Sequence, residues 1–234
     1  MWDRHYLQTA EIEIPDSFYT NDGLMYDAGA FFRPIGNETT PFTGHYDGDK
    51  YVIRNLQINR PSEDFVGLFG YTDGALIEKV GVVGATIQAK DFAGVVVGYM
   101  DKTGGASGDT VHSSFSDRST IQGNNNIGGL VGKVNESAVI VDSYSKAAVT
   151  GNESVGGLVG YSHHRSGTPN LPRIAYSYAA GSISATSAFG AVVGQHLTGS
   201  TYQEVFFNTD SLGTDGHGTE DPDPSGLTGV TSAQ

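Results

Sequence analysis

Charged and imidazole side chains gather in two polar insertions of this chain, 101–108 and 162–172. Such groups offer the hydrogen-bond donors and acceptors that a polar ligand needs, and loops on a rigid scaffold often carry binding residues. The alternative is that both insertions are loops of freely varying length. The residues that we expect to contact a ligand are Asp101, Lys102, His163, His164 and Arg165.

Metal chemistry has little support in the sequence. A zinc protease needs two histidines one helical turn apart and a glutamate, whereas the close pair here, His163 and His164, is adjacent. The chain has no cysteine, which excludes thiolate sites and disulfides. We therefore expect no cofactor. Calcium is a weaker alternative, because the Asp47-Gly-Asp49 turn and the acidic segment 220–223 offer oxygen ligands without forming a complete calcium loop.

The sequence also gives little support for a pair of catalytic carboxylates. General acid–base catalysis needs two ionisable groups close together. Asp117, Arg118 and Asp142 lie near one predicted strand, but the positions equivalent to Asp142 in neighbouring repeats are Ser113 and Tyr176. We therefore expect that the chain is not an enzyme, with a carbohydrate-active enzyme as an alternative.

These residues are positioned by a glycine-bounded repeat. Five apolar segments end in glycine, and their closing glycines are 28, 34, 28 and 34 residues apart. A period in this range is typical of stacked repeats. The predicted structural glycines are Gly70, Gly98, Gly132, Gly160 and Gly194.

Each period holds two further short apolar segments. One ends at 82, 115, 144, 178 and 207, which predicts a column of Phe115, Tyr144, Tyr178 and Phe207 packed in the core, or alternatively a ligand-binding aromatic stripe. The other centres on a residue 11 positions before a closing glycine, and these residues are Ile87, Ile121, Val149 and Ile183. Three strands per period predict an all-β fold, a right-handed parallel β-helix (β-solenoid) of about five to seven coils with an N-terminal capping coil.

Other architectures explain the pattern less well. An antiparallel sandwich also has regularly spaced strands, but it does not explain why the long insertions all fall at one edge. A propeller blade needs about 40 residues. The outward columns at 86, 120, 148, 182 and 88, 122, 150, 184 mix Thr, Gln, Ala and Ser, too irregular an array for ice binding.

The ends of the chain differ from its middle. Residues 1–45 are rich in aromatic side chains and are expected to open and cap the stack, 46–207 hold the repeats, and 208–234 are expected to be a polar tail or linker. The start has no signal-peptide pattern, and we interpret the chain as a piece of a longer one. The net charge of −13 argues against nucleic acid and anionic membranes as partners, and no apolar run is long enough to span a bilayer.

The repeats resemble the GLUG motif, named for a Gly-Leu-any-Gly core. That core is present as Gly67-Leu-Phe-Gly70, Gly129-Leu-Val-Gly132 and Gly157-Leu-Val-Gly160, after a similar lead-in at 33–56 and before a similar closing segment at 207–234. The resemblance implies a β-solenoid of the kind found in bacterial surface proteins, including adhesins and the N-terminal regions of immunoglobulin A proteases. It carries over no catalytic residue.

The expected function is therefore a non-catalytic, extracellular or cell-surface module of a bacterium. It would be the binding or scaffold region of an adhesin that uses loops on one solenoid edge, with a glycan or a surface protein as partner. The alternative is a structural subunit that stacks on copies of itself into extracellular fibres, since uncapped solenoid ends expose strand edges.

Overall fold

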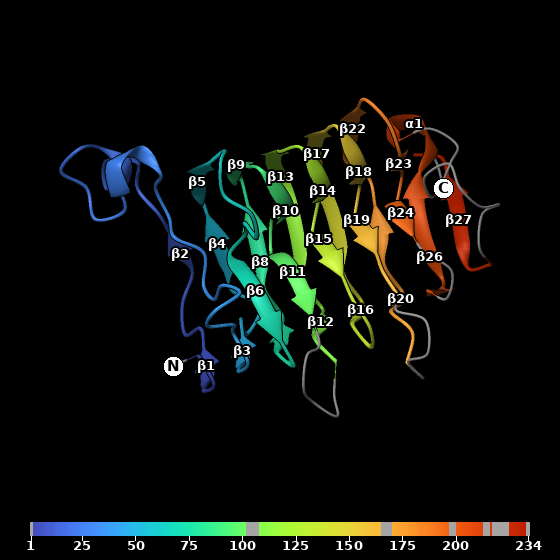
Figure 1. The fold of residues 1–234 in the computed structure, drawn as a ribbon, viewed down its shortest axis with the longest axis horizontal. Coiled ribbons are helices and arrows are strands. Elements are labelled where there is room, and N and C mark those ends of the chain that lie inside the picture. Colours follow the sequence, from blue (N-terminus) through green and yellow to red (C-terminus); the bar gives the residue numbers. More distant parts are fainter. Residues whose placement is uncertain are drawn as a thin grey trace.

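The computed structural model describes residues 2–101, 108–164, 170–196, 200–212, 216 and 225–232. Nearly all regular structure in these residues is β-strand, and the named strands pair in parallel along one axis, with the two termini at opposite ends of the stack (Figure 1). The expected all-β parallel solenoid is therefore confirmed. The helical elements are two 3₁₀ turns, Asp16–Tyr19 and Asp27–Gly29, and one short helix, α1 (Thr209–Leu212).

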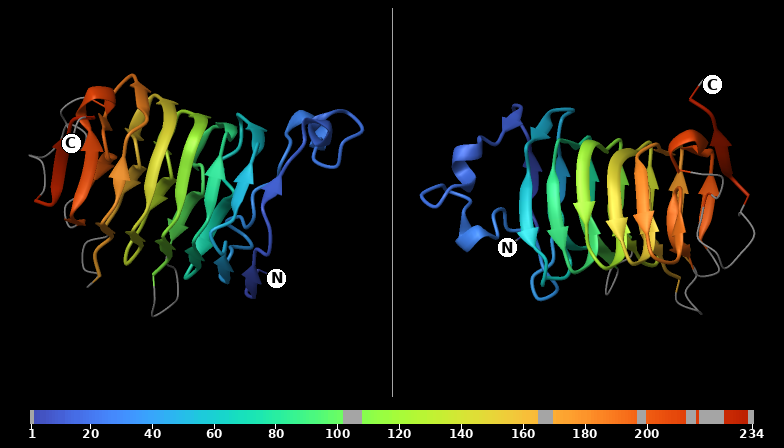
Figure 2. Two further views of the ribbon diagram at one scale, coloured as in Figure 1. Left: turned by 180° about the vertical axis from the view of Figure 1, so that it is seen from behind. Right: turned by 90° about the horizontal axis from the view of Figure 1, so that it is seen from above.

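Four parallel sheets form the walls of the solenoid (Figure 2). We name them A to D. Sheet A contains β1 (His5–Leu7), β3 (His45–Asp47), β7 (Leu76–Glu78), β12 (Thr110–His112), β16 (Val139–Val141), β20 (Arg173–Ala175) and β25 (Thr201–Gln203). Sheet B contains β2 (Ile12–Glu13), β4 (Val52–Arg54), β5 (Gln57–Arg60), β8 (Gly81–Val83), β9 (Thr86–Ala89), β13 (Phe115–Gln122), β17 (Tyr144–Gly151), β21 (Tyr178–Ala179), β22 (Ser182–Ala185), β26 (Val205–Asn208) and β27 (Leu227–Val230).

Sheets C and D complete each coil. Sheet C contains β6 (Phe69–Asp73), β11 (Val97–Asp101), β15 (Val131–Val134), β19 (Val159–Ser162) and β24 (Val193–His196). Sheet D contains β10 (Asp91–Gly94), β14 (Asn125–Gly128), β18 (Glu153–Gly156) and β23 (Phe189–Gly190). The chain runs from A through B and D to C, and then returns to A in the next coil.

Apolar columns inside this frame make a continuous core. In β9, exposed Thr86 and Gln88 alternate with buried Ile87 and Ala89, as expected for a strand with one face inward. The register places Ile87 beside Ile121 and Ile121 beside Val149. It continues from Val149 to Ile183. The column predicted from the spacing to the closing glycines is therefore confirmed.

The predicted aromatic column is in register from Phe115 through Tyr144 to Tyr178, whose rings lie outside the core, but it is wrong at its two ends. Phe115 pairs with Gly81, not with Val82, and Tyr178 pairs with Phe206, not with Phe207. Phe207 is in the core, whereas the rings of Phe115, Tyr144 and Phe206 lie on the outer face of sheet B. A slip of one residue exchanges the two faces of a strand. The stacked rings of Phe115 and Tyr144, 4.9 Å apart, therefore cover the surface rather than fill the core.

Buried serines hold the corner between sheets A and B. The Ser143 hydroxyl donates to the Val141 carbonyl (2.8 Å) and accepts from the Ser114 N–H of the preceding coil (3.2 Å). Ser114 bonds in the same way to the His112 carbonyl and the Val80 N–H, and the Ser143 N–H donates to Ser177. The serines thus replace backbone bonds that the bend interrupts, and they accept from the N–H groups of Val80, Ser114 and Ser143.

We expect Ser143→Ala to lower the free energy of unfolding by about 1–3 kcal/mol, because the buried Ser114 N–H loses its acceptor. Ser184→Ala, at an exposed strand position, is the matched control and should change stability little. Urea denaturation followed by circular dichroism measures both. Equal midpoints for the two variants would show that the serine ladder contributes no stability.

The closing glycines stack where sheets C and D approach each other. A Cβ added to Gly132 would lie 2.5 Å from the Ala93 nitrogen and 2.5 Å from the Gly98 oxygen. At Gly160 it would lie 2.5 Å from the Ile127 nitrogen and 2.6 Å from the Gly132 oxygen. No real Cβ is found so close to backbone atoms, so each coil needs glycine at this position to reach the one before it.

Both ends of the chain contribute to the stack. In the segment 1–45, β1 and β2 pair with β3 and β4, while bridges from Phe31 to Ile58 and from Ile35 to Phe69 cover the edges of β5 and β6. In the segment 208–234, β27 extends sheet B by pairing with β26. None of the helices in the described part of the chain is long and apolar enough to cross a membrane.

Candidate functional site

The predicted ligand contacts that the structure describes lie on the edge between sheets C and A. Asp101 ends β11, and His163 follows β19, where its N–H donates to the Val134 carbonyl (2.9 Å). His164 comes next in the chain, while Lys102 and Arg165 lie outside the described residues. Asp101 and His163 therefore occupy equivalent positions two coils apart, separated by about 10 Å at the usual strand spacing.

Asn135 fills the equivalent position between them, and the sequence analysis missed it. Its side-chain nitrogen donates to an Asp101 carboxylate oxygen (2.8 Å) and to the Tyr99 hydroxyl (2.6 Å). The other Asp101 oxygen accepts from the Tyr71 hydroxyl (2.5 Å). Burial and then this hydrogen bond raise the pKa of Tyr71 far above its usual value, so its phenol stays a donor. Asn135 and Tyr71 thus hold the Asp101 carboxylate in place at the edge.

Aromatic side chains continue this polar edge onto the outer face of sheet C. Tyr71 and Tyr99 pack 4.9 Å apart, and Phe65 stacks on Phe92 at 5.2 Å, beside both tyrosines. We define the aromatic face by these members and the two that extend it across the next coils. They are Phe65, Tyr71, Phe92, Tyr99, Lys133 and Tyr161.

Lys133 supplies a positive charge at the centre of the aromatic face. Its ammonium nitrogen lies 5.0 Å from the Tyr99 ring centre, 5.3 Å from that of Tyr161 and 5.6 Å from that of Phe92. Cations are attracted to the negative faces of aromatic rings. The Tyr161 ring is in turn 5.9 Å from the His163 ring, which connects the aromatic face to the predicted contact residue.

The two phenylalanines of the aromatic face have unusual backbone angles. Phe65 and Phe92 have φ of 61° and 55°, a left-handed conformation that is rare for bulky residues. The same corner carries Asn126, Ser154 and Ala188 in later coils, also with positive φ. The conformation therefore belongs to the corner, and placing phenylalanine there costs free energy. Strain of this kind is found at functional sites.

A signal for the aromatic face was present in the sequence. The residue directly after each closing glycine is Tyr71, Tyr99, Lys133, Tyr161 and then Gln195, and these positions pair in register along sheet C. Alternation places the residue after an inward glycine on the outer face. Examining this position across the repeats would have found the three tyrosines.

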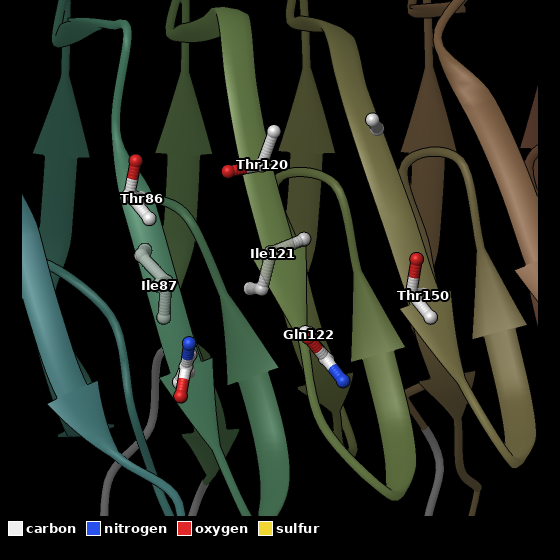
Figure 3. Close-up of a pocket in the computed structure, with 8 residues that line it drawn as sticks. Thr86, Ile87, Thr120, Ile121, Gln122 and Thr150 are labelled. Carbon is white, nitrogen blue, oxygen red and sulfur yellow. The ribbon is translucent and has the colours of Figure 1, made fainter.

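A groove without charged residues lies on a different wall, over the second half of sheet B. Figure 3 shows Thr86 and Thr120 on neighbouring strands, with Gln122 further along the same strand as Thr120. The groove coincides with the mixed polar columns recognised in the sequence.

The residues best placed to hold a metal ion are on sheet A. In the described part of the chain, His45, Asp47 and Glu78 bring one ligand atom each within 4.8 Å of one another. However, Lys79 already lies 3.1 Å from Asp47, and the His45 ring nitrogen lies 2.8 Å from a Glu78 oxygen. The hydrogen bond from the Asp49 N–H, ahead of Lys79, lowers the pKa of Asp47. Both carboxylates therefore already have partners within the protein, and calcium binding stays a prediction.

Comparison with known proteins finds one similar sequence and one solved structure with a similar fold. No protein-family model matches the chain, so the resemblance to GLUG repeats depends on the motifs alone. Over 142 residues, 59% of this chain, it is 32% identical to halomucin of Haloquadratum walsbyi, and the match covers 1% of that protein. A solved Bacteroides ovatus structure, provisionally described as an immunoglobulin A1 protease, is similar with a TM-score of 0.60 and 18% identity, covering 99% of this chain and 78% of that one. The second likeness shows the fold alone.

Proposed function

We propose that the chain is a non-catalytic binding module of a cell-surface or secreted protein and that it recognises a glycan through the aromatic face and the adjoining edge. The observation that carries this proposal is the pair of strained phenylalanines, Phe65 and Phe92, which add rings to a row of outward tyrosines. The apolar C–H faces of sugar rings pack on aromatic rings, and the sugar hydroxyls need nearby polar groups. Asp101 and Lys133 supply those groups, and Asn135 holds the Asp101 carboxylate in place.

The comparisons support the surface part of this proposal. The relative is named halomucin, and the Bacteroides ovatus structure is provisionally described as an immunoglobulin A1 protease. Both names suit proteins that work outside the cell. The adhesin role and the bacterial surface location follow from the motif resemblance and are part of the proposal.

Tyr161→Ala is expected to weaken glycan binding by at least about tenfold, because it removes the aromatic contact that joins Lys133 to His163 at the adjoining edge. Tyr176→Ala is the matched control, since Tyr176 is an exposed tyrosine at the corner between β20 and β21, on another wall. A glycan array followed by calorimetry on the strongest ligand provides the measurement. Equal losses in both variants, or no bound glycan, would overturn the proposal.

Two further measurements test the alternative functions, an enzyme and a fibre subunit. Release of new sugar ends from a bound glycan would show an enzyme rather than a binding module. Mass that rises with protein concentration in light scattering would favour the fibre subunit.

A further inference from the structure

The uncharged groove on sheet B is continuous across several coils. It consists of two adjoining hollows, of about 290 and 240 Å³, that share Thr86 and Gln88. Beneath them lies the buried isoleucine column of the core, so the floor is a regular sheet. The polar side chains that line the two hollows and point outward include Gln57, Asn59, Thr86, Gln88, Thr120 and Gln122.

Hydroxyls and amides make up the polar part of this lining. The chain carries 26 acidic and 13 basic residues, yet none of them lines either hollow. A charged ligand would find no opposite charge there and would lose its own hydration. The groove therefore suits an uncharged, polar ligand.

The polar groups repeat from coil to coil. Thr86 pairs with Thr120, and Gln88 pairs with Gln122, so each of these coils offers one hydroxyl and one amide. Successive pairs are about 4.8 Å apart along the axis. Within the described residues, the side chains of Thr86, Gln88 and Gln122 form no hydrogen bond with another protein group, which leaves their donors and acceptors to solvent or a ligand.

We infer that the groove binds an extended, uncharged polysaccharide that lies along the solenoid axis. Amides and hydroxyls both donate and accept hydrogen bonds, as sugar hydroxyls do. A linear glycan is long enough to contact several coils at once, and Phe31 supplies an aromatic ring at the N-terminal end of the groove. This site is separate from the aromatic face, because the two lie on different sheets, B and C.

Chain length is the first test. Calorimetric titration with cello-, manno- and chito-oligosaccharides, from disaccharide to hexasaccharide, should show for one series an affinity that rises with each added sugar and then levels off. The plateau is expected when the ligand covers the coils from Asn59 to Thr150. Oligogalacturonate of equal length should bind at least about tenfold more weakly, because its charges have no partner. Affinity independent of length, or no binding by any neutral series, would overturn the inference.

Variants then separate the two surfaces. The double variant Gln88→Ala with Gln122→Ala should weaken binding of the best neutral oligosaccharide by at least about tenfold, with an unchanged circular dichroism spectrum. Gln203→Ala, an exposed glutamine on β25 of sheet A, is the matched control. If the groove variant binds normally while Tyr161→Ala abolishes binding, the aromatic face is the glycan site and the groove is not. Loss in the groove variant alone would support the groove and contradict the proposed aromatic face.

Discussion

Replacing Gly132 by alanine is expected to lower the free energy of unfolding by about 3 kcal/mol, the upper end of the usual cost of overpacking. The added Cβ would lie 2.5 Å from the Ala93 nitrogen and from the Gly98 oxygen, two backbone atoms of the preceding coil. Ala93 belongs to the ladder between β10 and β14 and Gly98 to the ladder between β11 and β15, so moving either atom would disturb a ladder. Because every coil depends on its neighbours in a solenoid, the loss spreads beyond one position.

Gly84→Asn is the control for this variant. Nothing lies within 4 Å of a Cβ built on Gly84, and asparagine tolerates its positive φ of 68°. Urea denaturation followed by circular dichroism should therefore place Gly84→Asn close to the wild type and Gly132→Ala far below it. Similar midpoints for Gly132→Ala and the control would mean that the closing glycines are not required by packing.

The second large effect is the pH dependence of stability caused by Asp109. This carboxyl is 1% exposed and accepts hydrogen bonds from the Ala75 N–H (2.6 Å) and the Thr72 hydroxyl (2.9 Å). Burial, with a further contribution from the charges of Asp73 and Asp101, raises the pKa of Asp109 from 3.8 to about 8. The group is therefore neutral in the folded protein over a range in which it is ionised in the unfolded chain.

The sign of the effect follows from proton binding. Below pH 4 both states hold the proton and the stability contribution is complete. Between pH 4 and 8 the unfolded chain has lost this proton while the folded protein keeps it. The free energy of unfolding therefore falls as pH rises, by about 5 kcal/mol in total. Above pH 8 both states are ionised and the contribution no longer changes.

Asp109→Asn should remove this dependence, because an amide does not ionise. Its oxygen can accept from the Ala75 N–H, and its NH2 group would donate to the Thr72 hydroxyl in place of the hydrogen bond that the carboxyl accepts from it. The free energy of unfolding of the variant minus that of the wild type is expected to grow between pH 4 and 8 and then to level off. Asp22→Asn, at an exposed position in the N-terminal segment, is the control. Stability curves that run parallel for Asp109→Asn and the wild type would show that the buried carboxyl does not titrate in this range.

The coil could be predicted from the sequence because stacking requires an inward apolar residue and a closing glycine at the same positions of every coil. One inward column contains Ile87, Ile121 and Val149. Their constant spacing to the closing glycines is visible in the sequence and predicts the column. The aromatic column failed for a physical reason. The register errors fall at the two ends of the column, where β13 pairs with β8 and β21 pairs with β26, and a slip of one residue there assigns the wrong face.

The candidate site could be predicted only in part. Asp101 and His163 were found because they follow repeat strands at the same edge. The tyrosines of the aromatic face are far apart in the chain and meet only when the coil length is known. The left-handed phenylalanines could not be predicted, because nothing local in the sequence favours that conformation for a bulky side chain.

The two long insertions both lie where the chain passes from sheet C to sheet A, and the strands on either side keep their register: Asp101 still pairs with Asp73 before the first, and Thr110 with Leu76 after it. Mutation at this edge is thus decoupled from the core that folds the module. Under the proposed function, exchanging these loops would change what the module recognises and would leave the scaffold unaltered. Relatives with the same coils should therefore differ most in specificity at this one edge.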